Sequence, residues 1–310
     1  MTGSEGAGEL PSSCDGDTAT RLTQQGAENG KGVNFRNEPI AKVSRFDPER
    51  AVSPSDEPQQ TAMTSFARHG INHLSVSSVG LFAAEPALFV AERLLKRRGP
   101  VGASAHRGAA SEAGIVMGLM NPTASLDDCQ AHALTEFDRL TALSGDPRRA
   151  KEREAVPGIV LSGINELRMY GIPTAIQARV EKMLPGVPLP WVGFLDLFWE
   201  QSGIVLDIKS TLKLPTIASA AHARQVSLYT YDTNHEARVG YFTPSKRGVY
   251  RVDDRAKHIA DLVNVAQRLE RFLGLSDDPT FLASIVCPNV DAFWYSDPAT
   301  RAICQEIFGL

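Results

Sequence analysis

The alternation of apolar and polar positions indicates where folded structure begins. Residues 1–70 are rich in Gly, Ser, Asp, Glu, Gln and Pro and show no sustained apolar period. Such a segment cannot offset the entropy of its ordering by burial. We therefore expect a disordered leader over residues 1–70 and one folded domain over residues 71–310. Two short helical patterns open that domain, and the second restarts at Pro86, a residue favoured in the first turn of a helix.

Helical periodicity dominates the next part of the chain. One helix is expected to contain Glu112 to Leu119, and a second covers residues 127–143. The second carries apolar residues every third position, which we interpret as one packing stripe: Ala131, Leu134, Phe137, Leu140 and Leu143. A further helical stretch starts after Asp146-Pro147, begins again or kinks at Pro157, and ends before Gly171.

Beyond Pro173 the apolar period changes from about 3.6 to 2, the period of a strand. Residues 176–181 alternate in this way and predict a strand with one buried face. Residues 191–199 and 204–210 read as two more strands, and the short polar link between them predicts an antiparallel hairpin. The rest of the pattern predicts a helix over 217–231, strands over 238–243 and 249–252, a long amphipathic helix over 253–273 and a short helix after Pro298.

Taken together, these elements predict an α/β (α+β) fold. We expect a mixed, mostly antiparallel sheet flanked by helices, with the strand over residues 204–210 at its centre.

Composition narrows the class of protein. A chain of 310 residues with 43% hydrophobic residues can build its core without disulfide bonds. No apolar run approaches the roughly 18–20 residues that span a bilayer, and the polar start lacks the zones of a signal peptide. We therefore expect a cytoplasmic protein with no membrane partner. The formal charge of −4 argues against coating nucleic acid by bulk attraction, so a polyanion would have to meet local basic patches.

Candidate chemistry lies in the predicted hairpin. Asp207 and Lys209 are two residues apart, so both side chains should leave the same face of the sheet. The preceding strand carries Asp196 in an apolar run, where a carboxylate is costly unless a positive or hydrogen-bonding group meets it. Mg²⁺ and Mn²⁺ prefer oxygen ligands, and these carboxylates and the backbone carbonyl of Ile208 could supply them. Lys209 could orient or help to deprotonate an attacking water, an arrangement that suits hydrolysis of a phosphodiester.

The helix that follows carries a polar face. His222, Gln225 and Tyr229 stand at positions i, i+3 and i+7, and this face can lie over the sheet edge where the carboxylates point. His222 could contact a phosphate or be a satisfied polar neighbour of the site, and both readings stay open. Arg224 is one position off the face, which leaves either a solvent or a phosphate role.

These segments, in order, resemble a known family. Residues 193–196, 205–210 and 225–229 are similar to the motif series of RecB-like nucleases of the PD-(D/E)XK superfamily, including phage exonucleases. The segment before Glu112 lies where the family places its first motif, and the similarity spans roughly residues 73–300. The resemblance implies a restriction-endonuclease-like core.

The resemblance also assigns roles to residues. It implies that the catalytic residues are Glu112, Asp196, Asp207 and Lys209. The metal ligands would be Glu112, Asp196, Asp207 and Ile208. Residues that bind DNA or support the site would be Ser210, His222, Arg224, Gln225 and Tyr229.

Two departures from the family pattern bear on cofactors. Many relatives have His at the first motif, whereas this chain has Glu112, which resembles an acidic variant and leaves its status as a ligand open. Iron-sulfur relatives carry Cys-Pro in the opening helix and a cysteine cluster near the C-terminus. Here the dipeptide is Glu85-Pro86 and the late cysteines are scattered, so we expect Mg²⁺ or Mn²⁺ and no iron-sulfur cluster.

The function expected from these observations is metal-dependent hydrolysis of DNA. By resemblance, the enzyme would be an exonuclease used in DNA recombination, repair or phage DNA processing. The alternatives are a DNA-binding recombination-accessory module with little catalysis, a sequence-specific endonuclease, and a hydrolase of small phosphate esters. DNA is the expected partner, and a homo-oligomer or a recombination partner protein stays open.

Overall fold

The computed structural model of the chain describes residues 63–309. Residues 1–62 of the expected leader therefore lie outside the described residues. The last part of that leader is folded, because α1 (Ser65–Arg68) is capped by Thr64 and buries Phe66 completely. The folded part thus begins before the boundary at residue 70 that the sequence predicts, since one apolar side chain in a polar stretch produces no period to detect.

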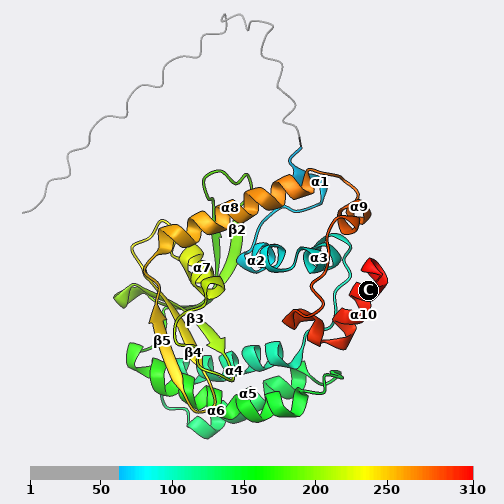
Figure 1. Ribbon diagram of the computed structural model, residues 1–310. Helices are drawn as coiled ribbons and strands as arrows, with labels where there is room; N and C mark the ends of the chain where they lie inside the picture. The colour runs from blue at the N-terminus through cyan, green and yellow to red at the C-terminus, as the bar shows by residue number, and fades with distance from the viewer. Residues whose placement is uncertain (1–62, 310) are drawn as a thin grey trace, which may run out of the picture. The chain divides into compact units, whose positions relative to one another are not determined.

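Within residues 63–309, five strands form one mixed sheet in the order β1-β2-β3-β4-β5 (Figure 1). They are β1 (Ala175–Lys182), β2 (Trp191–Trp199), β3 (Ile204–Ser210), β4 (Glu236–Phe242) and β5 (Arg247–Arg251). β3 is central and runs parallel to β4, while the other neighbouring pairs are antiparallel. The expected mixed, mostly antiparallel sheet is confirmed, and β2 and β3 have the bounds of the predicted hairpin. Its link is η3 (Glu200–Ser202) followed by Gly203, whose φ of +62° suits glycine.

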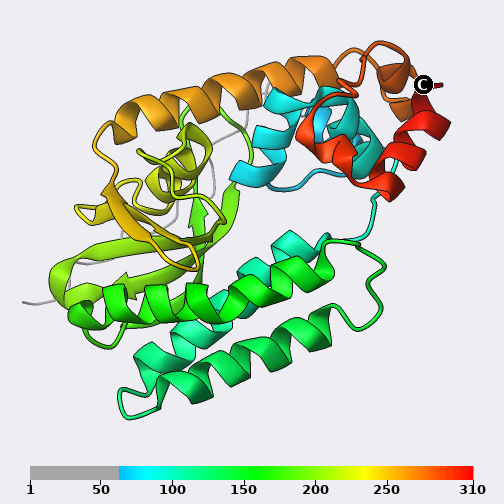
Figure 2. The same ribbon diagram turned by 60° about the horizontal axis from the view of Figure 1, so that its bottom comes forward.

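One face of the sheet is covered by helices from the middle of the chain (Figure 2). These are α4 (Ala103–Met120), α5 (Leu126–Leu140) and α6 (Arg149–Leu167), with η2 (Arg168–Tyr170) after α6. α4 and α6 pack their apolar side chains against alternate residues of β2 and β3, including Leu197, Leu206 and Ile208. α5 packs against α4 and α6 and lies farther from the sheet.

The predicted stripe on α5 is wrong. Leu143 lies beyond the helix end and is fully exposed, and Ala131 is also exposed. The buried face instead carries Cys129, Ala133 and Phe137. A strict three-residue spacing drifts around a helix of 3.6 residues per turn, so five such positions cannot share one face.

The opposite face of the sheet is covered by α7 (Ala220–Tyr229), which is backed by α8 (Arg255–Leu273). Early elements pack against α8, namely α2 (Val76–Ala84), α3 (Pro86–Phe89) and the π-helix η1 (Val90–Leu94). The C-terminal elements are α9 (Pro279–Ser284), η4 (Phe293–Ser296) and α10 (Pro298–Phe308). Among residues 63–309, no helix combines the length and the apolarity that crossing a bilayer requires.

Gly114 tests the packing of α4 on α5. A Cβ atom at this position would lie 2.8 Å from both Ala133 Cβ and the Cys129 carbonyl oxygen. We expect Gly114→Ala to lower the free energy of unfolding by about 1–3 kcal/mol, because the two helices would have to move apart. Gly80→Ala in α2 is the matched control, since nothing lies within 4 Å of a Cβ there, and it should be neutral or stabilising. Urea titrations measure both, and equal effects would contradict the packing.

Candidate active site

The candidate site lies where β2 parts from β3. The two strands pair only at one end, through Leu197↔Leu206 and the two pairs that follow towards the turn. Beyond this point the Ile208 N–H donates to Asp196 Oδ2 instead, with an N···O distance of 2.6 Å. The buried Asp196 carboxylate therefore satisfies a backbone donor that the strand pairing leaves free. This contact supplies the hydrogen-bonding partner that the apolar surroundings of Asp196 demand.

The side chains of β1 and β2 change face at this level of the sheet. In β1, Ile176 packs on the α4 and α6 side, whereas Ala178 packs on the α7 side. In β2, Leu197 and Leu195 divide in the same way. Residues two apart in a regular strand share a face. Each strand is therefore distorted at the residue between the two that point to different faces. In β1 that residue is Gln177, whose φ is +48°.

Gln177 links two of the predicted acidic residues. The flanking pairs of the β1–β2 ladder place it opposite Asp196, and its Nε2 lies 3.1 Å from Asp196 Oδ1. The same nitrogen donates to Glu112 Oε1, which reaches the site from α4. One amide therefore joins α4, β1 and β2 at the predicted site.

Asp207 and Lys209 meet on the neighbouring strand, as the two-residue spacing predicts. Lys209 Nζ lies 2.7 Å from Asp207 Oδ2. The Asp207 side chain is completely buried, yet among residues 63–309 neither of its oxygens receives a well-directed hydrogen bond. The contact with Lys209 is thus a buried ion pair, and among the described residues the carboxylate has no other hydrogen-bond partner, a costly state for a buried acid.

The carboxyl groups at this site repel one another. Burial and the charges of Asp207 and Glu112 raise the pKa of Asp196 to about 8. Burial also raises the pKa of Asp207 and of Glu112. For Lys209, burial acts to lower the pKa, but the three carboxylates outweigh it and raise the pKa. The cluster thus holds more acidic groups than one ammonium can neutralise.

This donor set suits a hard divalent cation. Among the described residues, no three His, Cys, Asp or Glu side chains are arranged as a ready metal-binding group. Here the Gln177 amide stands between Glu112 and Asp196. The available ligand atoms are nonetheless carboxylate oxygens, and within residues 63–309 the Asp207 oxygens have no hydrogen-bond partner beyond the ion pair with Lys209, so the chemistry fits Mg²⁺ or Mn²⁺. The Ile208 carbonyl as a further ligand stays a prediction.

The predicted Gln-x-x-x-Tyr pair lies beside the carboxylates. Gln225 Nε2 donates to the Tyr229 hydroxyl at 2.7 Å. Tyr229 is buried against β2, where a Cβ at Gly193 would lie 2.6 Å from its ring. Burial, with the charges of Asp207 and Asp196 added to it, raises the pKa of Tyr229. Gly193 thus permits α7 to approach β2 closely next to the site.

The other α7 residues divide between the site and α8. His222 Nδ1 lies 2.7 Å from the Tyr241 hydroxyl, and burial together with the positive charge of Lys209 lowers the pKa of His222 to about 4. These contacts fit the hypothesis that His222 is a neutral, hydrogen-bonded neighbour of the site. The other hypothesis, contact with a phosphate, stays a prediction. Arg224 points to α8, where its Nη1 lies 4.0 Å from Asp261 Oδ2.

Arg107 supports the end of β3, a role that sequence reasoning missed. Its Nη2 donates to the Ser210 carbonyl at 3.1 Å, and its Nε lies 3.4 Å from Ser210 Oγ. Its Nη1 forms a buried ion pair with Glu152 of α6. Arg107 of α4 thus holds Ser210, the last residue of β3, which directly follows Lys209. The only sequence signal was a charged residue among small residues of the predicted helix.

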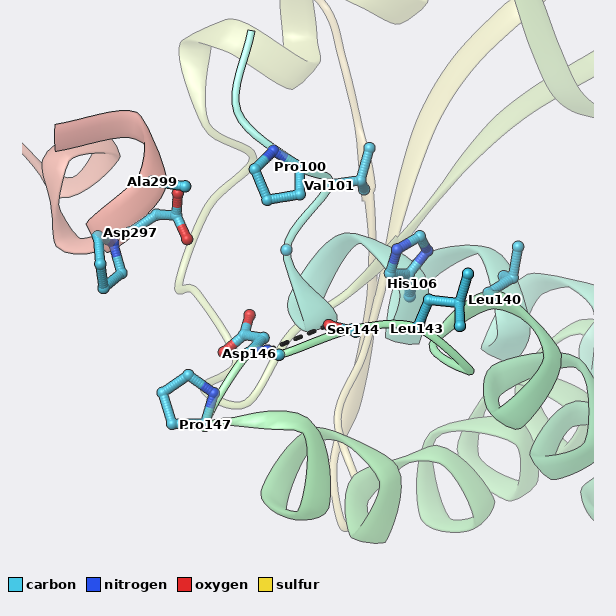
Figure 3. A pocket seen from close by; sticks show the side chains of 13 residues that line it. Pro100, Val101, His106, Leu140, Leu143, Ser144, Asp146, Pro147, Asp297 and Ala299 are labelled. Atoms are coloured by element: carbon cyan, nitrogen blue, oxygen red, sulfur yellow. Dashed lines mark hydrogen bonds between the residues drawn. The ribbon is translucent and has the colours of Figure 1, made fainter. Parts of the chain in front are cut away.

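The pocket in Figure 3 is separate from these residues. It encloses about 560 Å³ and is lined by residues near the start of α4, the α5–α6 connection and the start of α10, among them His106, Leu140, Asp146 and Asp297. None of the predicted catalytic residues lines it. A groove of about 320 Å³ instead lies next to Tyr229, between the start of α2, β2 and α7.

Comparisons with known proteins assign no family. No family model matches the chain, and no curated protein matches it. Among solved structures, the chain is similar to one described as "Crystal structure of SSO0001", with 14% identity, over 59% of this chain and 84% of that chain. The TM-score is 0.29, too low to support an argument about fold or function.

Glu152→Ala tests the support beneath β3. The substitution would leave Arg107 buried without its partner, so we expect it to lower the free energy of unfolding by about 3–5 kcal/mol. Glu306→Ala is the control, because it removes a carboxylate from an exposed pair with Arg97 and should have little effect. Chemical denaturation measures both, and a negligible effect of Glu152→Ala would contradict the role of the buried pair.

Proposed function

We propose that this chain is a divalent-metal-dependent DNA nuclease with a restriction-endonuclease-like core, of the PD-(D/E)XK superfamily. The observation that carries the proposal is the fully buried Asp207 carboxylate, which is paired with Lys209 at 2.7 Å and lies beside two further carboxyl groups. It stands on the central strand of a mixed sheet. Asp196 and Glu112 join the same cluster through Ile208 and Gln177.

The residues of the cluster would have different roles in phosphodiester hydrolysis. Asp207, Asp196 and Glu112 would hold the cation, with the Ile208 carbonyl as the further ligand. When bound, the cation supplies charge stabilisation at the phosphate and activates water. Lys209, held beside Asp207, would donate hydrogen bonds to the attacking water or to a phosphate oxygen.

The groove beside Tyr229 is the surface proposed for a polymeric substrate, although none of the four proposed catalytic residues lines it. The adjoining groove is open along the start of α2, β2 and α7, and it is lined in part by Phe194 and Gln225. Phe194 is 51% exposed and can lie against a base. The choice of an exonuclease, acting in recombination, repair or phage DNA processing, is proposed from the resemblance of the motifs alone.

Removing the acid or the amine of the central strand tests catalysis. We expect Asp207→Asn and Lys209→Met each to slow Mg²⁺-dependent or Mn²⁺-dependent cleavage of end-labelled linear DNA at least about 10²-fold. Asp232→Asn and Lys151→Met are the matched controls, because they make the same charge changes at exposed positions, and cleavage should be unchanged. Equal activity of the Asp207 and Lys209 variants and the wild type would remove these residues from the mechanism.

The form of the DNA separates the alternatives. An exonuclease should degrade linear DNA and leave a covalently closed circle intact. Cleavage of the circle would favour an endonuclease. DNA binding without metal-dependent cleavage would favour an accessory module and would contradict the proposal.

Metal binding can be measured without a substrate. Mn²⁺ at about 100 times its dissociation constant should stabilise the wild type by about 2.7 kcal/mol, seen as a rise in Tm over the value in chelator. Asp207→Asn should lose most of this rise, because it removes a charged ligand, whereas Asp232→Asn should keep it. The same rise in both variants would place the cation elsewhere.

A further inference from the structure

Gln177 occupies a position that the proposed catalytic roles do not use. Its side-chain nitrogen lies within hydrogen-bond distance of one oxygen of Glu112 and one oxygen of Asp196. An amide nitrogen has two hydrogens, enough to donate one to each carboxylate. It therefore makes, as a neutral group, the bridging contact that a cation shared by these two carboxylates would make.

The backbone of Gln177 is shaped around this contact. Its φ of +48° is in the left-handed region, which residues other than Gly, Asn and Asp rarely adopt. At the same distortion, the side chains of β1 change face: Ile176 packs on one side of the sheet and Ala178 on the other. Strained backbone of this kind persists where the surrounding contacts hold it, often at functional sites.

We propose that the Gln177 amide holds Glu112 and Asp196 together in the cation-free protein and yields their facing oxygens when a divalent cation binds, so that it sets the metal affinity of the site. A cation that binds these same two oxygens would compete with the amide nitrogen, because that nitrogen already contacts both of them. Gln177 is in this sense a positioning residue that acts through the two carboxylates. The inference rests on the proposed metal site but not on the nature of the substrate.

Loss of the amide has two opposite consequences. Without a cation, Glu112 and Asp196 lose their shared donor, so the protein becomes less stable in chelator. With a cation, no competitor has to leave, so binding becomes tighter. If the amide holds both carboxylates about nine-tenths of the time, its removal tightens the apparent dissociation constant about tenfold. A residue that served packing alone would lower stability without raising affinity.

The test is titration of Mn²⁺ into the metal-free full chain. Binding is measured by calorimetry and by the paramagnetic resonance signal of free Mn²⁺. Two variants are used, Gln177→Ala and Gln177→Gly, since glycine keeps the left-handed backbone without strain. Gln267→Ala in α8 is the control, because it removes a glutamine amide that donates to the carbonyl of Gly186 in the β1–β2 connection, outside the acidic cluster. We expect both Gln177 variants to bind Mn²⁺ about tenfold more tightly and to melt at a lower temperature in chelator. The control should keep wild-type affinity.

The outcomes separate this inference from the proposed function. Unchanged or weaker Mn²⁺ binding in both Gln177 variants overturns the inference. A higher Mn²⁺ affinity in only one of them traces the effect to the backbone and also overturns the inference. Cleavage of DNA by the wild type, measured in parallel, decides the nuclease proposal independently. Tighter binding without any cleavage supports the role of Gln177 and removes the nuclease. Absence of Mn²⁺ binding by all variants overturns both.

Discussion

The arrangement of the site is governed by the burial of one carboxylate, that of Asp207. Asp207 is completely inside the protein on the central strand, and Lys209 is the cation beside it among the described residues. With Asp196 and Glu112 drawn into the same cluster, the negative groups outnumber the ammonium, and burial makes their repulsion stronger. An apolar residue at Asp207 would pack at lower cost, and the proposed metal site accounts for the carboxylate at this position.

The cluster lies where β2 parts from β3, and side chains from both helical layers surround it. Glu112 comes from α4 on one face of the sheet, and Tyr229 comes from α7 on the other. Both approach the sheet near the level where Asp196 takes the place of pairing between β2 and β3. Beneath it, the buried pair of Arg107 and Glu152 fixes the end of β3, so that Asp207 and Lys209 are presented by a strand held at both ends.

Local patterns in the sequence predicted the hairpin well. The alternation and the short polar link located β2 and β3, and the two-residue spacing predicted the pairing of Asp207 with Lys209. Gln177 and Arg107 were beyond such reasoning, because their partners lie 65 and 45 positions away and their roles depend on how the layers pack. The left-handed backbone of Gln177 has no local signal, since glutamine is not a residue that favours it. The stripe expected on α5 failed for a different reason, a spacing that drifts around the helix.

The proposed function requires these carboxylates to share a divalent cation. Anomalous diffraction from crystals soaked in Mn²⁺ tests it most directly, because the signal locates the metal without reference to activity. We expect one strong peak within about 2–2.5 Å of oxygens of Asp207 and Asp196, with the Gln177 amide turned away from Glu112. A cluster that stays free of manganese at saturating concentration, with Gln177 still bridging Glu112 and Asp196, would contradict the account.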